Sequence, residues 1–288
     1  MKVSVVIPCL NAEKTIAVQL EALTHQQWSQ AWEVIISDNG SSDSTLSIVE
    51  KYQMIIPNLR IVDASDRIGA SHARNVGAKA AEGEAILFID ADDEVAPGWL
   101  AAMGEALSKY DFVAGHDDYN KLNNSWVVKS YQLENGSGVM ENTYYLPFAG
   151  SGNLGIKRAI HEKIGGFDET LYQSEDVDYC WRVSYVGTKL HYVPDAIAHI
   201  RLRNSLASIY HRSWIVGKGG ILVYKKHRPL GMPQLVTWKT LLKTSVILTF
   251  QMLFLQIRDK ESFTKWLISL AWRGGQLWGC IKYQYLPL

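Results

Sequence analysis

The chain has 288 residues with 29 basic and 29 acidic side chains, so its formal net charge is zero. This length can bury a substantial core, and a 47% hydrophobic content is that of an ordinary globular protein, which argues against a disordered or fibrous chain. The charge is unevenly distributed, because residues 1–200 hold 15 Lys and Arg against 27 Asp and Glu, whereas residues 201–288 hold 14 against 2.

Strands and helices are predicted to alternate along the first ninety residues. The expected strands are Val3–Ile7, Trp32–Ser37, Leu59–Val62 and Ala85–Ile89. The expected helices between them are Glu13–Gln26, Asp43–Gln53 and Ala70–Ala81. This alternation predicts an α/β fold of the Rossmann-like kind, a mostly parallel sheet with flanking helices on both faces. Ligands of such sheets bind beyond the carboxyl ends of the strands.

The pattern becomes less regular after residue 97. The expected elements are a helix at Trp99–Lys109, β-like segments at Phe112–Gly115 and Trp126–Leu133, a helix at Ser174–Gly187 and an extended piece at Lys189–His199. We expect the β-like segments to form a mixed sheet edge that builds the far wall of a cleft.

An acidic cluster follows the fourth expected strand in "AILFIDADDE", residues 85–94. Four consecutive apolar residues predict a strand covered on both faces, and the chain then reaches Asp90, Asp92 and Asp93. Carboxylate oxygens are hard ligands that can hold Mg²⁺ or Mn²⁺ beside a substrate phosphate. An EF-hand does not fit, because Val95 stands where its invariant glycine belongs. A solvated turn remains the alternative for this loop taken alone.

Five ordered blocks of the sequence resemble one family, the inverting glycosyltransferases of family 2, which have the GT-A fold. The blocks are "VSVVIPCLNAEKTI", "EVIISDNGSSDST", "RIGASHARNVGAKAAEGEAILFIDADDEVAPGWL", "GGFDE" and "SEDVDYCWR". They occur in the family's order and together span about residues 1–200. The resemblance implies transfer of a sugar from a nucleotide-diphosphate donor to a hydroxyl of a glycan or lipid-linked acceptor, and the donor expected from it is a UDP-sugar.

The resemblance also implies which residues bind the donor. Pro8 and Asn11 match the first nucleotide-contacting loop, and Asp38 matches the acid that receives the imide N–H of the base, which suits uracil or thymine. The alternative for Asp38 is a turn cap. Asp66, which replaces a common Asn, and Arg74 match positions near the base and diphosphate. The alternative for Arg74 is a solvated helix residue.

A divalent cation, Mn²⁺ or Mg²⁺, is implied as the cofactor. Asp90 would lie on the ribose side and Asp92 would bind the metal that bridges the diphosphate, with Asp93 beside them. His199 matches a histidine that approaches the metal or diphosphate in related enzymes, although a structural role is the alternative. The metal would neutralise charge on the departing nucleoside diphosphate.

The catalytic base and the acceptor side follow from the same resemblance. Asp176, with Glu175 as its neighbour, matches the general base that takes the proton of the acceptor hydroxyl. The alternative is that both are acids in the first turn of a helix, favoured there by the helix dipole. Ser151 and Asn153 match a segment that lines the acceptor side.

Two other classes of function remain as alternatives. A sugar nucleotidyltransferase would open with a Gly-rich loop and a Lys or Arg after the first strand, and "VIPCLNAE" has neither. A catalytically inert glycan-binding or scaffold protein would be expected to lose Asp92 or Asp176, and both are present. Nucleic-acid binding is not expected, since no recognised motif accompanies the basic tail.

The tail is predicted to be a separate helical region, with residues 1–210 as the catalytic domain and 211–288 as the appendage. Residues Thr244–Ile257 are 14 positions without a charge, about 21 Å as a helix, which is too short for a hydrocarbon core of about 30 Å. Four Trp and many basic residues fit a helix pair lying on an anionic membrane surface. Packing on the catalytic domain or on a second subunit, as a homo-oligomer, is the alternative.

The cellular compartment is predicted from the cysteines and the first residues. Cys9, Cys180 and Cys280 have no metal-type spacing, which indicates a reducing compartment without structural disulfides. The apolar run in "MKVSVVIPCLN" is too short for a signal peptide. We therefore expect a cytoplasmic protein, peripheral on the cytoplasmic face of the membrane.

Overall fold

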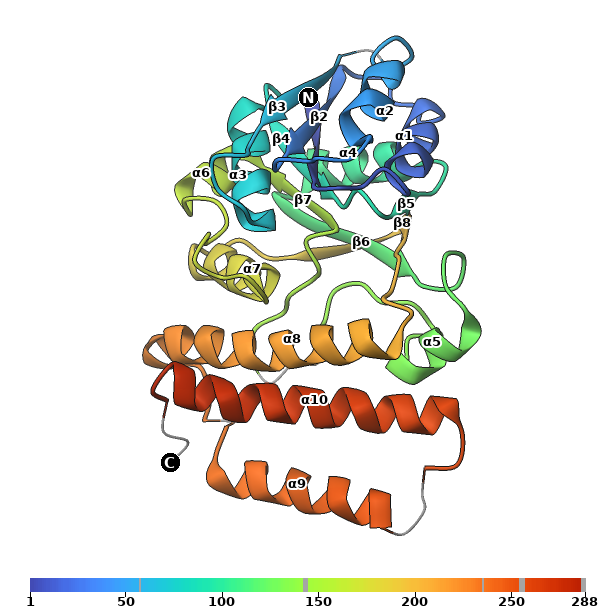
Figure 1. Ribbon diagram of the computed structural model, residues 1–288. Coiled ribbons are helices and arrows are strands. Elements are labelled where there is room, and N and C mark those ends of the chain that lie inside the picture. Colours follow the sequence, from blue (N-terminus) through green and yellow to red (C-terminus); the bar gives the residue numbers. More distant parts are fainter. Residues whose placement is uncertain (57, 142–144, 235, 254–256, 286–288) are drawn as a thin grey trace. The chain divides into compact units, whose positions relative to one another are not determined.

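The protein forms two compact units (Figure 1). The computed structural model describes residues 1–56, 58–141, 145–234, 236–253 and 257–285. The first unit contains residues 1–121 and 135–201, and the second contains residues 122–134 and 202–288.

In the described part of the chain, an eight-stranded mixed sheet organises the first unit. Figure 1 shows how the helices lie around this sheet. Its strands are β1 (Val3–Cys9), β2 (Trp32–Asp38), β3 (Leu59–Asp63), β4 (Ala85–Ile89), β5 (Glu94–Val95), β6 (Phe112–Asp118), β7 (Asn153–Lys157) and β8 (His191–His199). Their order is β3-β2-β1-β4-β7-β6-β8-β5. The four strands from β3 to β4 are parallel, whereas β7 is antiparallel to both β4 and β6. The predicted parallel sheet with a mixed edge is confirmed.

Helices cover both faces of this sheet. They are α1 (Ile16–Thr24), α2 (Thr45–Tyr52), α3 (Ala70–Ala80), α4 (Trp99–Lys109), α6 (Arg158–Lys163) and α7 (Glu175–Tyr185). Residues of α1, α2 and α4 share one apolar core with the sheet, and residues of α3 and α7 share a second core on the opposite face.

The central strand β4 contributes to both cores. Leu87 and Ile89 belong to the first core, Ile86 and Phe88 to the second, and all four are fully buried. Complete burial of such a side chain contributes about 1.5–3 kcal/mol. This explains why the strand reads as a continuous apolar run. It also means that the acidic cluster begins where the strand leaves the core.

One predicted strand is wrong, because residues of Trp126–Leu133 form the helix α5 (Ser125–Tyr131). The β-branched and aromatic side chains of "WVVKSY" favour a strand, but strand propensity yields to packing. Val127 and Val128 are buried, and α5 packs on α10 (Lys260–Lys282) of the same unit. The Lys260 ammonium lies 3.5 Å from the centre of the Trp126 ring, a cation–π contact.

Long helices form most of the second unit. They are α8 (Leu206–His227), the short 3₁₀ helix η1 (Arg228–Leu230), α9 (Trp238–Leu253) and α10. The pair α8 and α10 approach closely at glycines: an added Cβ on Gly217 would collide with the Trp272 carbonyl oxygen, and one on Gly275 with that of Trp214.

No helix among the described residues has both the length and the apolar composition that crossing a bilayer requires. The expectation for Thr244–Ile257 is therefore confirmed within α9, which ends at Leu253, and residues 254–256 lie outside the described part of the chain. The outer side of α9 is apolar, with Leu242 64%, Val246 66% and Phe250 49% exposed.

Candidate active site

The ends of β1 and β2 lie next to each other, with Cys9 paired to Asp38 in the sheet register. Pro8 is half-buried in β1, and Asn11 follows it in a loop with a positive φ of 50°. The Asn11 N–H donates to Ser41 Oγ at 2.9 Å, and Asn11 Oδ1 accepts the N–H of residue 42 at 2.8 Å. Asn11 therefore fixes the loop after β1 against the loop after β2.

Asp38 ends β2 and is 6% exposed. Its carboxylate accepts the N–H groups of Gly40 at 3.2 Å and Ser41 at 3.1 Å, which are turn-cap contacts. A carboxylate has about four lone-pair sites, so these two donors leave room for a ligand donor. Asp43 caps α2, because its Oδ1 accepts from the Thr45 N–H at 3.0 Å and from Thr45 Oγ1 at 2.5 Å.

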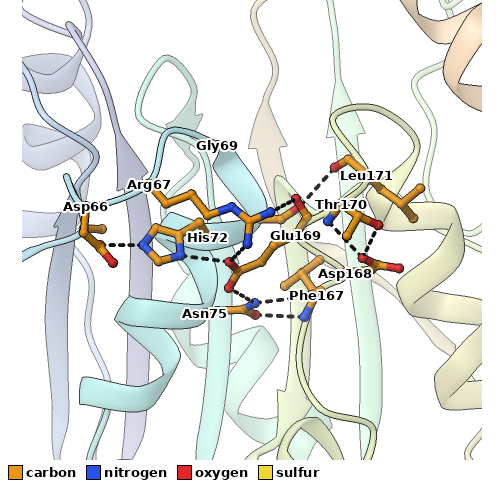
Figure 2. Close-up of polar contacts among 12 residues, drawn as sticks. Asp66, Arg67, Gly69, His72, Asn75, Phe167, Asp168, Glu169, Thr170 and Leu171 are labelled. Atoms are coloured by element: carbon orange, nitrogen blue, oxygen red, sulfur yellow. Dashed lines mark hydrogen bonds and ion pairs between the residues drawn. The ribbon is translucent and has the colours of Figure 1, made fainter.

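Asp66 lies in the loop between β3 and α3 with its side chain 77% exposed. Its Oδ1 is 2.8 Å from His72 Nε2, and His72 Nδ1 is 3.0 Å from Glu169 Oε2 (Figure 2). Burial lowers the pKa of His72, but hydrogen bonds to Asp66 and Glu169 outweigh it, so the pKa is raised overall. The donor loop predicted from Asp66 is thus tied to α3.

Arg74 connects two of the predicted blocks from α3. It is 3% exposed, which rules out a solvated helix residue. Its guanidinium donates to Asp90 Oδ1 at 2.7 Å and to Glu175 Oε1 at 3.1 Å. Its Nε is buried without a hydrogen-bond partner among the described residues. Burial lowers the pKa of Arg74, but the charges of Asp90 and Glu175 outweigh burial and raise it, so the group stays charged.

The three carboxylates after β4 converge as the sequence suggested. One oxygen from each of Asp90, Asp92 and Asp93 lies within 4.8 Å of the others. An added Cβ on Gly152 would lie 3.0 Å from Asp90 Oδ2 and 3.4 Å from Asp93 Oδ2, so only glycine leaves this approach open. Arg201 closes the other side, because its N–H donates to Asp93 Oδ1 at 2.8 Å and its Nε to the Asp92 carbonyl at 2.9 Å.

The electrostatics of this cluster suit a cation. Asp93 is 3% exposed, and burial together with the charges of Asp90 and Asp92 raises its pKa well above the usual range. Three carboxylates this close repel one another, and a divalent cation would remove that repulsion. An all-oxygen donor set is the type that Mg²⁺ and Mn²⁺ prefer, so the residues present fit the implied metal.

Asp176 lies in the first turn of α7, half-buried, and its Oδ1 accepts the Val177 N–H at 2.8 Å. Its neighbours have other partners: Glu175 binds Arg74, and the fully buried Asp178 binds Arg182 at 2.7 Å. Acids in the first turn are also favoured by the helix dipole. The charge of Asp176 also contributes to raising the pKa of Arg74, after the larger effects of Asp90 and Glu175.

His199 ends β8, where its backbone pairs with Glu94 of β5. Its Nδ1 is 2.7 Å from Asp118 Oδ2, and it lies outside the group formed by the three clustered aspartates. Burial raises the pKa of Asp118, but the hydrogen bond from His199 outweighs it and lowers the pKa overall. A metal or diphosphate contact of His199 stays a prediction.

The two predicted acceptor-side residues differ in their surroundings. Ser151 is 5% exposed in the turn before β7. Asn153 is 2% exposed, with Oδ1 accepting from Trp99 Nε1 at 2.8 Å and Nδ2 donating to the carbonyls of His116 and Ala196 at 3.2 Å. Asn153 therefore joins α4, β6 and β8, and its contact with an acceptor sugar stays a prediction.

Three residues near the site were not predicted from the sequence: Arg201, Asp117 and Glu169. Arg201 follows His199 by two positions, and Glu169 closes the quoted "GGFDE" block, so both lay within recognised segments. Asp117 is the second-last residue of β6, and burial, opposed by hydrogen bonds from Asn153, Tyr119 and Ser137, raises its pKa to about 7. Nothing in the sequence near Asp117 indicates that it is buried close to the acidic cluster.

Comparison with known proteins agrees with this geometry. The family model described as glycosyl transferase family 2 matches residues 4–165, more than half of the chain. Glycosyltransferase AglE of Haloferax volcanii is 28% identical over 229 residues, which cover 78% of this chain and 75% of that protein. The poly(ribitol-phosphate) β-N-acetylglucosaminyltransferase TarS of Staphylococcus aureus is 41% identical over 97 residues, 33% of this chain and 17% of TarS.

Solved structures show the same fold at low sequence identity. The mannosyltransferase PcManGT from Pyrobaculum calidifontis, in complex with GDP-Man and Mn²⁺, has a TM-score of 0.66 at 20% identity, covering 96% of this chain and 87% of that one. TarS residues 1–349 in complex with UDP-GlcNAc have a TM-score of 0.56 at 18% identity, covering 99% and 92%. The fold is that of a GT-A glycosyltransferase. The chain belongs to glycosyl transferase family 2 and is a glycosyltransferase.

Proposed function

We propose that this glycosyltransferase transfers a sugar from a UDP-sugar to an acceptor hydroxyl with inversion at the anomeric carbon, using Asp176 as the base. The observation that carries the proposal is the buried guanidinium of Arg74, which holds Asp90 and Glu175 together. It joins the acidic cluster after β4 to the segment of the candidate base, so one site contains both.

The proton of the acceptor hydroxyl goes to the Asp176 carboxylate as the hydroxyl oxygen attacks the anomeric carbon. The new bond forms on the face opposite the bond that breaks, which inverts the configuration. Arg74 keeps the adjacent Glu175 fixed and thereby orients the first turn of α7. A divalent cation, Mn²⁺ or Mg²⁺, held by Asp92 with Asp90 and Asp93 would neutralise the charge of the departing nucleoside diphosphate.

The donor-binding residues are proposed to be Pro8, Asn11, Asp38 and Asp66. Pro8 and Asp38 lie at the carboxyl ends of β1 and β2, and Asn11 and Asp66 lie in the loops after β1 and β3, at the sheet edge where nucleotides bind in such folds. Asp38 would accept the imide N–H of uracil, because its carboxylate retains lone pairs beyond those used by its own turn. Among the fold neighbours, TarS carries UDP-GlcNAc and PcManGT carries GDP-Man, so the experiment below compares uracil and guanine nucleotides.

The acceptor is proposed to be a glycan or a lipid-linked saccharide, with Ser151 on its side of the site. We further propose peripheral contact of the second unit with the cytoplasmic face of a membrane. This is supported by the apolar outer side of α9 and by the 14 basic against 2 acidic residues in positions 201–288. A lipid-linked acceptor would be presented at that surface.

The function is tested by calorimetric titration of the full-length protein with UDP- and GDP-sugars, each with Mn²⁺ and with EDTA. We expect tight binding of one UDP-sugar that EDTA abolishes, and release of UDP when an acceptor saccharide is added. Equal affinity with and without metal would contradict the metal role of the Asp90 cluster. A clear preference for a guanine nucleotide would contradict the uracil assignment of Asp38.

A further inference from the structure

Glu169 is a charged hub outside the residues assigned above. Its Oε2 lies 3.0 Å from Arg67 Nη1 and 3.0 Å from His72 Nδ1, and its Oε1 accepts from Asn75 Nδ2 at 2.9 Å. Its backbone carbonyl accepts from Arg67 Nη2 at 3.1 Å. Figure 2 shows these contacts converging on one side chain. The carboxylate is therefore bound by three side chains of the loop and helix around α3.

Asn75 holds the backbone of the same segment. Its Oδ1 accepts the Phe167 N–H at 2.8 Å, and its Nδ2 donates to the Phe167 carbonyl at 2.9 Å (Figure 2). This approach depends on Gly166, which has a φ of +71° and where an added Cβ would lie 2.5 Å from Asn75 Oδ1. The ring of Phe167 is 2% exposed and stacks on Tyr179 of α7 at 4.0 Å.

The hub lies between the two halves of the proposed site. On the donor side, Asn39 at the end of β2 donates to the Arg67 carbonyl at 2.8 Å and accepts the Gly69 N–H at 2.7 Å, which fixes the loop after β3. On the other side, residues 170–174 connect Glu169 to Glu175 and Asp176 at the start of α7.

We propose that Glu169 is a positioning residue, which fastens the segment leading to Asp176 onto the donor loop and α3. This inference rests on the proposed function, since it assigns Asp176 as the base. The segment 170–174 between them contains no helix or strand, and within it the buried Leu171 accepts a hydrogen bond from Ser71 Oγ of α3 at 3.5 Å. Arg74 holds one end through Glu175, and Glu169 holds the other.

The charge states support this role. The hydrogen bonds of Asn75 and His72 outweigh burial and lower the pKa of Glu169, and those of Asp66 and Glu169 itself raise the pKa of His72. The groups facing His72 are Asp66 and Glu169, and Arg67 faces Glu169. His72 is therefore a cation between two carboxylates at mildly acidic pH, and it loses that charge as pH rises through its raised pKa.

The test compares Glu169→Ala, Glu169→Gln and His72→Gln in the full-length protein. A displaced base slows chemistry, and a shift of about 1 Å can cost about 10²-fold in rate. We expect kcat to fall at least about tenfold in Glu169→Ala, with donor affinity measured by calorimetry within about twofold of the wild type. Glu169→Gln retains an acceptor for Asn75, so its loss should be smaller. Glu162→Gln, the same change at an exposed position, is the control.

Two further readouts separate positioning from a general loss of folding. The double variant Glu169→Gln with His72→Gln should lose no more than the worse single variant, because the two residues act through one contact. Amide hydrogen exchange of residues 167–176 should be faster in Glu169→Ala than in the wild type. This exchange measurement needs no donor, so it tests the inference even if the wild type transfers no sugar, which would overturn the proposed function alone.

A Glu169→Ala protein with wild-type kcat and unchanged exchange would overturn the inference while leaving the function standing. Additive losses in the double variant would do the same. The inference would also be overturned if kcat and donor affinity fell together and the melting temperature dropped. That pattern indicates loss of folded protein and not a misplaced base.

Discussion

The side chain of Arg74 connects two parts of the candidate site, the acidic cluster after β4 and the first turn of α7. Asp90 and Glu175 are far apart in sequence, and the buried Arg74 guanidinium forms an ion pair with each of them, at 2.7 Å and 3.1 Å. The same guanidinium lies 5.5 Å from the centre of the Phe167 ring. Breaking a buried pair of this kind leaves an uncompensated charge, so Arg74 is as much a structural residue as a functional one.

Asp176→Asn should lower turnover about 10²-fold or more, because the amide preserves the shape of the side chain but cannot take the proton. Binding of the nucleotide sugar should be unchanged, since Asp176 is assigned no donor contact. Initial rates and calorimetry on the same protein measure the two quantities. Asp195→Asn, at an exposed position of the first unit, is the control. If the variant has the normal rate, Asp176 is not the catalytic base and is only an acid favoured at the start of a helix.

His161 should make the protein acid-sensitive. Its side chain is 6% exposed, and its Nδ1 lies 2.7 Å from Tyr179 Oη. Burial, with the charges of Arg182 and Arg158, lowers its pKa to about 4, whereas an unfolded histidine has a pKa of about 6.5. Between these values the unfolded chain binds a proton that the folded protein does not, so stability falls as pH falls from about 6.5 to about 4.

His161→Gln removes this titration and retains a polar partner for Tyr179. From pH 7.5 to pH 5 the wild type should lose about 2 kcal/mol more unfolding free energy than the variant, measured by urea denaturation. Asp117, with its pKa raised to about 7, acts in the opposite direction, but it is present in both proteins and cancels in the comparison. Equal pH dependence of the two proteins would contradict the lowered pKa of His161.

At the scale of elements, the close approach of α8 and α10 depends on glycines. Gly217→Ala would drive a methyl group against the Trp272 backbone, and such overpacking costs about 1–3 kcal/mol. Gly220→Ala, three residues along the same helix, meets nothing within 4 Å and should stabilise by about 0.5–1 kcal/mol. Thermal unfolding followed by circular dichroism should therefore shift in opposite directions for the two variants. A similar shift in both would show that the helices can separate without loss.

The sequence predicts more of the helices and strands of the first unit correctly than of the second. The strands β1 to β4 and the helices between them repeat a regular apolar pattern, and the carboxylates of "DADD" follow directly from a buried strand. These are local signals. The predicted strand Trp126–Leu133 is instead part of α5, which packs on α10. Because α10 lies more than a hundred residues later in the chain, no local sequence pattern indicates this contact.

The same limit applies to the site. Asp38, Arg74 and the Asp90 cluster stand in recognisable blocks, and the structure brings Arg74 and Asp90 into contact. The contacts of Arg201 with the cluster, and of Glu169 with α3, join residues about a hundred positions apart. Sequence could indicate that these residues lie near the site, but the partner of each depends on the register of β8 and on the turn at Gly165 and Gly166.

At the scale of the whole molecule, the charge is divided between acidic and basic parts of the chain. The acidic part contains the carboxylate cluster, and the last 88 positions hold 14 of the 29 basic residues. An acidic surface is repelled by anionic lipid, whereas basic residues near such a surface each contribute about 1 kcal/mol of attraction. This division of charge is one basis of the proposed membrane contact of the second unit.

Binding of the second unit to anionic membranes should depend on the outer side of α9. The exposed side chains of Leu242, Val246 and Phe250 recur at intervals of four residues, beside Lys239 and Lys243. Insertion of such a face adds to the attraction of the lysines, so high salt should release the protein only in part. We expect the full-length protein to float with vesicles that contain anionic lipid and to float less with neutral vesicles.

The matched variants decide between membrane contact and protein packing. Val246→Glu with Phe250→Glu places two acids on the apolar side of α9 and should abolish flotation. The control is Met54→Glu with Ile55→Glu in the first unit, where the side chains are 91% and 59% exposed, and it should leave flotation unchanged. Because none of these four side chains belongs to the buried core, neither double variant should unfold the protein, which circular dichroism checks. Flotation that survives the change on α9 would refute its role. A wild-type protein that never floats, but forms a dimer that Val246→Glu with Phe250→Glu dissociates, would show that a second copy covers this face.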